Sequence, residues 1–422
     1  MKQRNPKLAA MLSIIPGLGQ FYNKRFIKGS IFLIFFISFI SVFYQFLNIG
    51  FWGLFTLGTI PKLDDSRILL AQGIISVLLI LFAIFLYVLN IIDAYRNAQR
   101  FNRGEEIKDP RARRIASWDK TFPYLLISPG MFLLIFVVVF PLLFMGAVAF
   151  TNYNLYHAPP RHTLEWVGLD NFKTLFTIDI WRNTFFSVIT WTLVWTLVAT
   201  TLQIALGLFL AIIVNHPVVK FKKLIRTVLI LPWAVPSFVT ILIFAALFND
   251  EFGAINNDIL TPLLGFAPAW LNDPFWAKVA LILIQTWLGF PFVFALFTGV
   301  LQSISPDWYE AADIDGASSW QKFRHITLPH VLFATAPLLI MQYAGNFNNF
   351  NLIYLFNKGG PPVPGQNAGS TDILISWVYS LTFEFNNFNM GAVVSLIIGF
   401  IVAIIAFFQF RRTSTFKDEG GI

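Results

Sequence analysis

The chain has 422 residues, of which 56% are apolar and 12% are charged, about half the charged share of an ordinary soluble domain. This composition excludes a disordered chain, a coiled coil and an ordinary soluble enzyme, and it indicates an integral membrane protein. The net charge is +8 and there is no cysteine, which excludes a disulfide framework, a thiolate metal site and a cysteine nucleophile.

Eight segments are long and apolar enough to cross a bilayer as helices. Alternating strands of the outer-membrane barrel type are not visible, so the predicted fold is an all-α polytopic membrane protein. Residues 8–21 are apolar but short and contain Pro16, Gly17 and Gly19. We predict that they are interfacial or re-entrant, with a ninth span left open. No small-residue cleavage site follows the basic first residues, so we expect no cleaved signal peptide. The eight predicted spans are residues 29–48, 68–92, 122–150, 184–214, 227–248, 279–301, 335–356 and 391–410.

The distribution of Lys and Arg predicts that both termini lie inside the cell. With that orientation most of the 30 Lys and Arg residues fall on the inner side. The positive charge is then explained by topology and by contact with anionic lipid, and no nucleic-acid partner is expected. The basic clusters are Lys2 to Lys28, Arg96 to Lys120, Lys220 to Arg226 and Arg411 to Lys417.

The chain is predicted to divide near residue 120. Residues 94–120 form a charged linker that contains proline. We therefore predict an accessory region at 1–120 with two spans, a six-span core at 121–412 and a cytoplasmic tail at 413–422.

The inside loop at residues 302–330 carries several acidic residues, whereas the other inside loops are basic. Ser305 is a suitable N-cap and Pro306 a suitable first residue for a short helix, which Gly316 can end in a left-handed conformation. A second short helix is predicted to follow and to stop at Pro329. On composition alone, a solvated connector is an equal alternative.

This loop resembles the EAA loop of ATP-binding-cassette (ABC) importer permeases. The resemblance covers about residues 305–329, in particular Glu-Ala-Ala at 310–312, Asp-Gly-Ala at 315–317 and the following Phe323, Leu328 and Pro329. It implies a coupling helix that sits in a cleft of a separate ATPase, with Glu310 paired to a basic residue there. The implied ATPase-coupling residues are Glu310, Ala311, Ala312, Asp315, Gly316 and Ala317.

Polar side chains inside the predicted spans indicate a site for a neutral ligand. Gln342, Asn346 and Asn349 are spaced at i, i+4 and i+7, so the pattern predicts that they share one helical face, where Gly345 leaves room. Amides can donate to and accept from sugar hydroxyls, and an ionic substrate would call for a buried charge. Hydrogen bonding between helices is an alternative role for each of these amides.

Two other spans add to this pattern. Gln285, Gly289 and Phe292 have the same spacing in the sixth span, and Trp233 and Ser237 are four residues apart in the fifth, between Pro232 and Pro236 that open its backbone. Aromatic rings can cover the apolar face of a sugar. Packing is the alternative role for the aromatic residues.

Residues 231–238, 286–292 and 345–361 resemble the larger permease subunit of maltose importers, in that subunit's order. The resemblance implies a type I ABC importer core and a sugar site midway across the membrane. This chain differs from the best-known member at Trp233 and Phe292 (both Tyr there), Gln285 (Asn), Gln342 (Ser) and Gly345 (Phe). The implied substrate-binding residues are Trp233, Ser237, Gln285, Trp287, Leu288, Gly289, Phe292, Gln342, Gly345, Asn346 and Asn349.

The predicted function is the permease subunit of an ATP-driven importer for maltose or maltodextrin, working by alternating access. A permease for another oligosaccharide or a polyol is the first alternative. An ion-coupled secondary transporter or a non-transporting scaffold is a further alternative, but the core spans show no acidic or histidine relay away from their ends.

No ATP-binding motif GxxxxGK[ST] occurs, so ATP and Mg²⁺ are expected on a partner ATPase, and no catalytic residue, metal site or bound cofactor is expected in this chain. The expected partners are a second homologous permease, two copies of a cytoplasmic ATPase, an extracellular sugar-binding protein and membrane lipid. The outer loop at 151–183 is short where the best-known maltose subunit has a folded domain, which favours the cell membrane of a single-membrane bacterium with a lipid-anchored binding protein.

Overall fold

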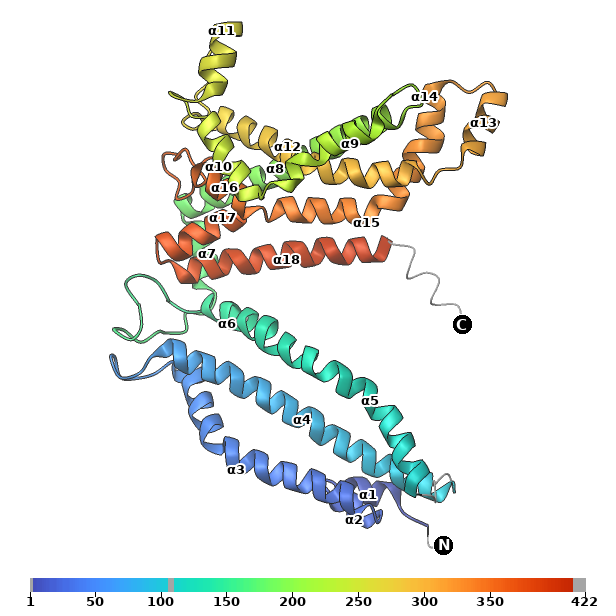
Figure 1. Cartoon of the computed structure of the whole chain (residues 1–422). Helices are drawn as coiled ribbons and strands as arrows, with labels where there is room; N and C mark the ends of the chain where they lie inside the picture. The colour runs from blue at the N-terminus through green and yellow to red at the C-terminus, as the bar shows by residue number, and fades with distance from the viewer. Residues whose placement is uncertain (1–2, 105–109, 413–422) are drawn as a thin grey trace. The chain divides into compact units, whose positions relative to one another are not determined.

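The computed structural model describes residues 3–104 and 110–412, and these residues form helices and connecting turns with two isolated β-bridges (Figure 1). The predicted all-α fold is confirmed. The predicted tail at 413–422 lies outside the described residues. The chain forms two compact units, Met1–Asn171 and Phe172–Ile422.

The first unit contains two long helices, α3 and α4, that pack along each other, followed by a third span. Glycines on both helices allow the close approach, since a Cβ at Gly73 would lie 2.6 Å from Leu54 Cβ. The predicted linker is largely helical, because α4 continues beyond the span and α5 begins soon after it. The helices are α1 (Pro6–Leu12), α2 (Leu18–Tyr22), α3 (Phe26–Thr56), α4 (Ser66–Asn102), α5 (Pro110–Leu134), the π-helix η1 (Ile135–Val139) and α6 (Phe140–Val148).

The N-terminal segment forms two short helices and does not span. α1 has seven residues and α2 has five, far fewer than the roughly 20 that a bilayer requires. Asn90 of α4 holds the turn between them, accepting from the Gly17 amide at 3.2 Å and donating to the Ser13 carbonyl at 2.9 Å. Residues 8–21 therefore form no spanning helix, and their interfacial or re-entrant placement stays a prediction.

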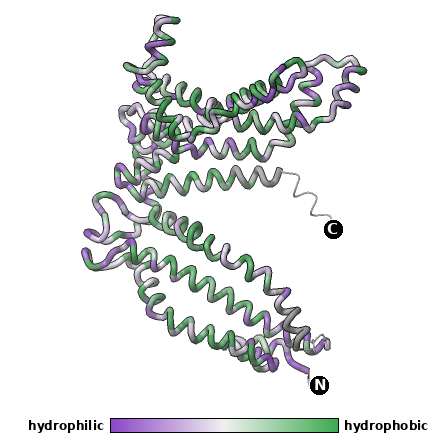
Figure 2. The backbone as a smooth tube through the Cα atoms, viewed as in Figure 1, coloured by the Kyte–Doolittle hydropathy of each residue, from purple (hydrophilic) through white to green (hydrophobic). Residues whose placement is uncertain are grey.

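The second unit is built on the pair α8 and α12, which pack along most of their length. Apolar residues alternate with polar loops along the tube in Figure 2, and the green runs follow the long helices. The helices of this unit are α7 (Asp170–Thr177, at the boundary), α8 (Asp179–Asn215), α9 (Lys222–Ile230), the 3₁₀-helix η2 (Leu231–Ala234), α10 (Ser237–Leu247), the π-helix η3 (Ile255–Leu260), α11 (Thr261–Leu264), α12 (Pro274–Leu301), α13 (Pro306–Ile314), α14 (Ser319–Lys322), the π-helix η4 (Phe323–Thr327), α15 (Leu328–Phe347), α16 (Phe350–Asn357), α17 (Leu374–Tyr379), the π-helix η5 (Ser380–Glu384) and α18 (Phe388–Arg412).

The predicted spans correspond to these helices, with a bend in the fifth span and a break in the seventh. Six are apolar helices long enough to cross a membrane. The predicted span at 227–248 is a bent pair instead, in which Lys222–Ala234 and Ser237–Leu247 meet at 88°. Pro232 and Pro236 remove backbone donors at this bend. The eighth predicted span corresponds to α18.

Candidate functional site

Four amide side chains from three parts of the second unit form one hydrogen-bonded cluster. Gln285 of α12 donates from Nε2 to Asn346 Oδ1 at 2.8 Å and to Gln203 Oε1 at 3.2 Å. Its Oε1 accepts from Asn349 Nδ2 at 2.9 Å. Gln203, Gln285 and Asn346 are all buried. An amide in an apolar interior needs such partners, since a buried polar group without one costs about 1–3 kcal/mol.

Gln342 extends this cluster toward the surface. Its Oε1 accepts from Gln203 Nε2 at 3.2 Å, and its side chain is half-buried. Gln342 therefore connects the buried amides with the accessible part of the predicted site.

The cluster sits at a break in the seventh span. α15 ends at Phe347 and α16 begins at Phe350, so the prediction that Asn349 continues the helical face of Gln342 and Asn346 is wrong. Asn349 is the N-cap of α16, and its Oδ1 accepts from the Leu352 amide at 3.4 Å. Asparagine favours such caps over helix interiors because its side chain competes for backbone donors. The break still brings Asn349 to Gln285.

Trp233 and Ser237 do not lie on one continuous helix, because the 88° bend falls between them. Both are exposed in this chain, Trp233 with 57% of its surface accessible. The Trp233 ring meets Phe292 edge to face at a centroid distance of 5.7 Å. Two of the predicted aromatic residues therefore lie together.

The predicted site residues divide by accessibility. Gln285 and Asn346 are buried and bonded within the chain, whereas Leu288, Gly289, Phe292, Gln342 and Asn349 are half-buried. Leu288 packs against a buried apolar cluster. The exposed members are Trp233, Ser237, Trp287 and Gly345.

Three residues of α8 that were not predicted from the sequence complete the cluster. Besides Gln203, Thr200 Oγ1 accepts from Asn346 Nδ2 at 2.8 Å, and Trp195 Nε1 donates to the Asn346 carbonyl at 2.9 Å. A signal was present, because the buried face of α8 carries polar and small residues about one turn apart. These are Thr192, Thr196, Thr200, Gln203, Gly207 and Ala211.

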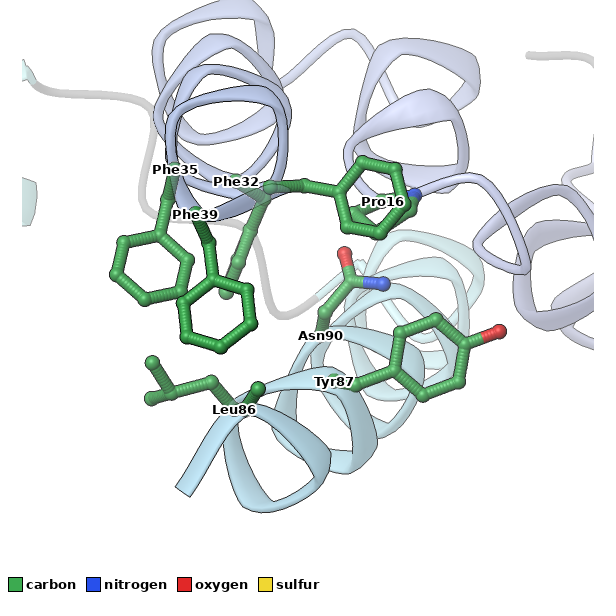
Figure 3. Close-up of a pocket in the computed structure, with 9 residues that line it drawn as sticks. Pro16, Phe32, Phe35, Phe39, Leu86, Tyr87 and Asn90 are labelled. Carbon is green, nitrogen blue, oxygen red and sulfur yellow. The ribbon is translucent and has the colours of Figure 1, made fainter. Parts of the chain in front are cut away.

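A separate pocket in the first unit has a different character (Figure 3). Phe32, Phe35 and Phe39 of α3 line it with Leu86 and Tyr87 of α4. Its lining is almost entirely apolar, and the Asn90 side chain at its edge is already bonded to backbone groups, so it lacks the free amides of a sugar site.

The acidic loop at 302–330 forms the first predicted short helix as α13, and the second begins as α14. Ser305 Oγ accepts from the Asp307 amide at 3.3 Å at the start of α13, and Gly316 has a positive φ of 73° after its end. The prediction that Pro329 stops the second helix is wrong, since α14 continues through η4 into α15. Pro329 falls in the first turn of α15, directly after the π-helical turn, where a missing N–H is tolerated.

α13 presents most of its side chains to the surroundings. Glu310 is exposed, and its side chain has no hydrogen bond or ion pair within the described part of the chain. Large apolar groups are exposed on the same two helices, with Ile314 of α13 87% and Trp320 of α14 65% accessible. The neighbouring Asp313 is paired with Lys322 at 2.6 Å. A free acid among exposed apolar groups is typical of a surface that docks a partner.

Three comparisons with known proteins bear on this arrangement. A family model described as "Binding-protein-dependent transport system inner membrane component" matches residues 203–415. The galactooligosaccharides transport system permease protein GanP of Bacillus subtilis is 53% identical over 98% of this chain and 99% of its own length. The maltodextrin transport system permease protein MalC of Streptococcus pneumoniae is 45% identical over 99% of this chain and 98% of its own. In fold, one chain of a bacterial ABC transporter for alginate import matches with a TM-score of 0.58 at 20% identity, covering 72% of this chain and all of that one.

A polytopic helical protein with a polar cluster between its spans and an exposed acidic loop has the features expected of a transport permease. The chain belongs to the family of binding-protein-dependent transport system inner membrane components. The resemblance to ABC importer permeases is thereby confirmed. The chain is a non-catalytic translocation subunit and a multi-pass membrane protein.

Proposed function

We propose that this chain is the permease subunit through which an ABC importer moves a short neutral oligosaccharide into the cell by alternating access. The observation that carries the proposal is the amide cluster, which joins α8, α12, α15 and the start of α16 and contains no ionised group. Its members are Gln203, Gln285, Gln342, Asn346 and Asn349. Amides offer both donors and acceptors, as sugar hydroxyls do. The exposed rings of Trp233 and Trp287 can cover a sugar's apolar face.

Two sugars are candidates within this class. Galacto-oligosaccharide comes first, because the permease of that system is 53% identical to this chain over almost its whole length. Maltodextrin, which the sequence pattern predicts, comes second, supported by permeases that are 45% and 44% identical, each over 99% of this chain.

The full transporter is proposed to contain four further parts. A second homologous permease would complete the pathway, two ATPase copies using ATP and Mg²⁺ would drive it, and an extracellular binding protein, tethered by lipid, would deliver the sugar. On this chain the ATPase surface would be α13 and its turn, with Glu310 in contact with a basic group.

Uptake by the purified importer in lipid vesicles tests this function. With ATP available to the ATPase, labelled galactobiose and maltotriose should be supplied with the binding protein, with and without an ionophore. Uptake that requires ATP and survives the ionophore is the expected result, and the preferred sugar decides between the two candidates. Uptake that collapses with the ionophore would instead indicate an ion-coupled transporter.

Alanine variants separate the two roles of the asparagines. If Asn346 and Asn349 contact the sugar, each variant should raise KM about tenfold, since losing a buried hydrogen bond costs about 1–3 kcal/mol. Assembly and basal ATPase activity should persist. If they only join helices, KM should stay normal while the complex loses stability in detergent. Because Asn346 already bonds to Thr200 and Gln285, the larger effect on KM is expected at Asn349.

A further inference from the structure

The hydrogen bonds of the amide cluster run in one direction. Each amide along the path donates from its nitrogen to the oxygen of the next: Asn349 to Gln285 at 2.9 Å, Gln285 to Gln203 at 3.2 Å, and Gln203 to Gln342 at 3.2 Å. An amide group has one oxygen and one NH₂, so an amide whose oxygen is occupied must present its nitrogen elsewhere.

The direction is set by a backbone group at the helix break. The Leu352 N–H at the start of α16 can only donate, and it donates to Asn349 Oδ1 at 3.4 Å. This bond turns Asn349 Nδ2 toward Gln285, and the same orientation passes along the other amides. The N-cap therefore fixes which atom of each amide faces its neighbour.

The last amide is left with unused donors. Gln342 is half-buried, and its Nε2 has no partner among the residues that the structure describes. Its Oε1 is held by Gln203, which is completely buried on α8.

From these contacts we propose that Gln203 is a positioning residue for substrate selectivity. It holds Gln342 with its Nε2 toward the pathway, so that this nitrogen donates to one acceptor oxygen of the transported sugar. The inference rests on the proposed function, and it assigns a role to a residue outside the set that the sequence predicted.

Gly289 of α12 explains how Gln203 is held so firmly. A Cβ at this position would meet Gln203 Oε1 and would lie 2.6 Å from Gln203 Cδ. The glutamine side chain therefore occupies space that only glycine leaves open. With one bond at each end and α12 against its side, Gln203 has little freedom to let Gln342 rotate.

The same helix pair supplies a matched control. Thr201 Oγ1 and the Tyr343 hydroxyl form a hydrogen bond of 3.0 Å that also joins α8 to α15. It lies outside the amide path. Thr201→Val therefore removes a bond of similar kind from the same pair of helices without releasing Gln342.

The experiment measures how well the complete importer tells the sugar from analogues that lack one hydroxyl. For the transported disaccharide and each of its monodeoxy derivatives, kcat/KM for uptake is determined in vesicles. In the wild type, kcat/KM should fall about tenfold or more when one particular hydroxyl of the sugar is missing. Gln342→Leu should abolish the loss at that hydroxyl and at no other, which identifies it as the group that Gln342 binds.

Gln203→Met should abolish discrimination at the same hydroxyl and keep discrimination at the others. Combined with Gln342→Leu, it should cause no further loss of discrimination. Thr201→Val should keep it everywhere. If Gln203→Met does not assemble, Gln203→Leu replaces it, because this apolar side chain has no donor for Gln342 Oε1 and should also cancel the discrimination.

Two results overturn the proposal. Discrimination in the Gln203 variants that equals the wild type, with uptake of every sugar lowered alike, assigns Gln203 a purely structural role. If Gln342→Leu discriminates normally, the Gln342 side chain does not bind the sugar. Uptake by the wild type would still support the proposed function. Failure of the wild type to take up any oligosaccharide would instead reject the function itself.

Discussion

Close packing of α8 against α12 depends on two positions without a side chain. A Cβ at Gly207 would lie 2.8 Å from Val293 Cβ, and one at Gly289 would displace Gln203. These glycines bring the two backbones together, and this approach places Gln203 within reach of Gln285.

We expect Gly289→Ala to be destabilising, because the added methyl group overpacks the interface by about 1–3 kcal/mol. Sugar uptake should fall with it, since Gln203 must move. Gly299→Ala is the control on the same helix. A Cβ there has no heavy atom within 4 Å, and alanine favours a helix over glycine by about 0.5–1 kcal/mol. Thermal unfolding of the two purified variants checks the difference, and equal melting temperatures would contradict it.

Asp372 makes the loop before α17 sensitive to pH. Its carboxylate accepts from the Ser376 hydroxyl at 2.7 Å and from the Gly369 amide at 2.8 Å. Burial is the largest influence on this group and raises the pKa of Asp372 to about 6. Glu384, whose charge also raises this pKa, is the other acid that acts on it.

An unfolded aspartate has a pKa of about 3.9. Between that value and about 6 the folded chain holds a proton that the unfolded chain releases. Stability should therefore fall as pH rises from 4 to 6 and stay lower above 6. The melting temperature should be higher at pH 5 than at pH 7.5, and Asp372→Asn should reduce this difference. Glu251→Gln, at an exposed acid, should leave it unchanged. If the difference in melting temperature between pH 5 and pH 7.5 persists in Asp372→Asn, other groups cause the pH dependence.

At the scale of the elements, the positions of the spans could be predicted, and the breaks within them only in part. Long apolar runs located α3, α4, α8 and α12, because each must satisfy its own backbone inside a bilayer. Pro232 and Pro236 indicated an opened backbone at the bend after η2. The break at Asn348 and Asn349 was not predicted, since a run of asparagines fits a polar helix face as well as a cap.

The buried partner of the site was also missed. Gln203 is the one amide on α8 between Asn183 and Asn215. The small and polar residues that recur about one turn apart on α8 indicate a buried face, but they do not tell a contact with α12 from one with another subunit. Only the packing of α8 on α12 shows that Gly289 leaves space for it. Polar residues on one span therefore predict a cluster only when the spans that pack against it are known.

Glu310 on α13 should couple ATP hydrolysis to transport. We expect Glu310→Lys to release or uncouple the ATPase, because a partly buried charge that loses its partner can cost several kcal/mol. Glu310→Gln should have a smaller effect of the same kind, since it loses the charge-assisted part of the bond. Copurification of the ATPase and sugar-stimulated ATP hydrolysis are the measurements.

The control for this charge reversal is Glu251→Lys, at an exposed acid in the predicted outer loop before η3. It should copurify normally. A basic-to-acidic change on the ATPase should partly restore transport to Glu310→Lys. Wild-type behaviour of Glu310→Lys in both assays would leave Ala311, Ala312 and Gly316 as the docking residues.

At the scale of the whole molecule, one chain presents only part of a pathway. Three residues of the proposed site are exposed, so no described part of the second unit covers them from the other side. These are Trp233, Ser237 and Trp287. Gln342 keeps free donors there. Polar side chains exposed at membrane depth are costly unless a cavity or another protein faces them. A second permease would supply that opposite wall.

We therefore expect that the chain inserts into membranes but transports no sugar by itself. Vesicles with this chain and the ATPase but without the second permease should show no ATP-dependent uptake, even with the binding protein present, and adding the second permease should restore it. The chain must be shown by protease accessibility to be inserted in both preparations, so that absent uptake is not absent protein. Uptake at the full rate without the second permease would mean that this chain, alone or paired with itself, encloses the whole pathway. In that case Trp233 and Ser237 should contribute from both copies, and Trp233→Ala would then remove two aromatic contacts at once.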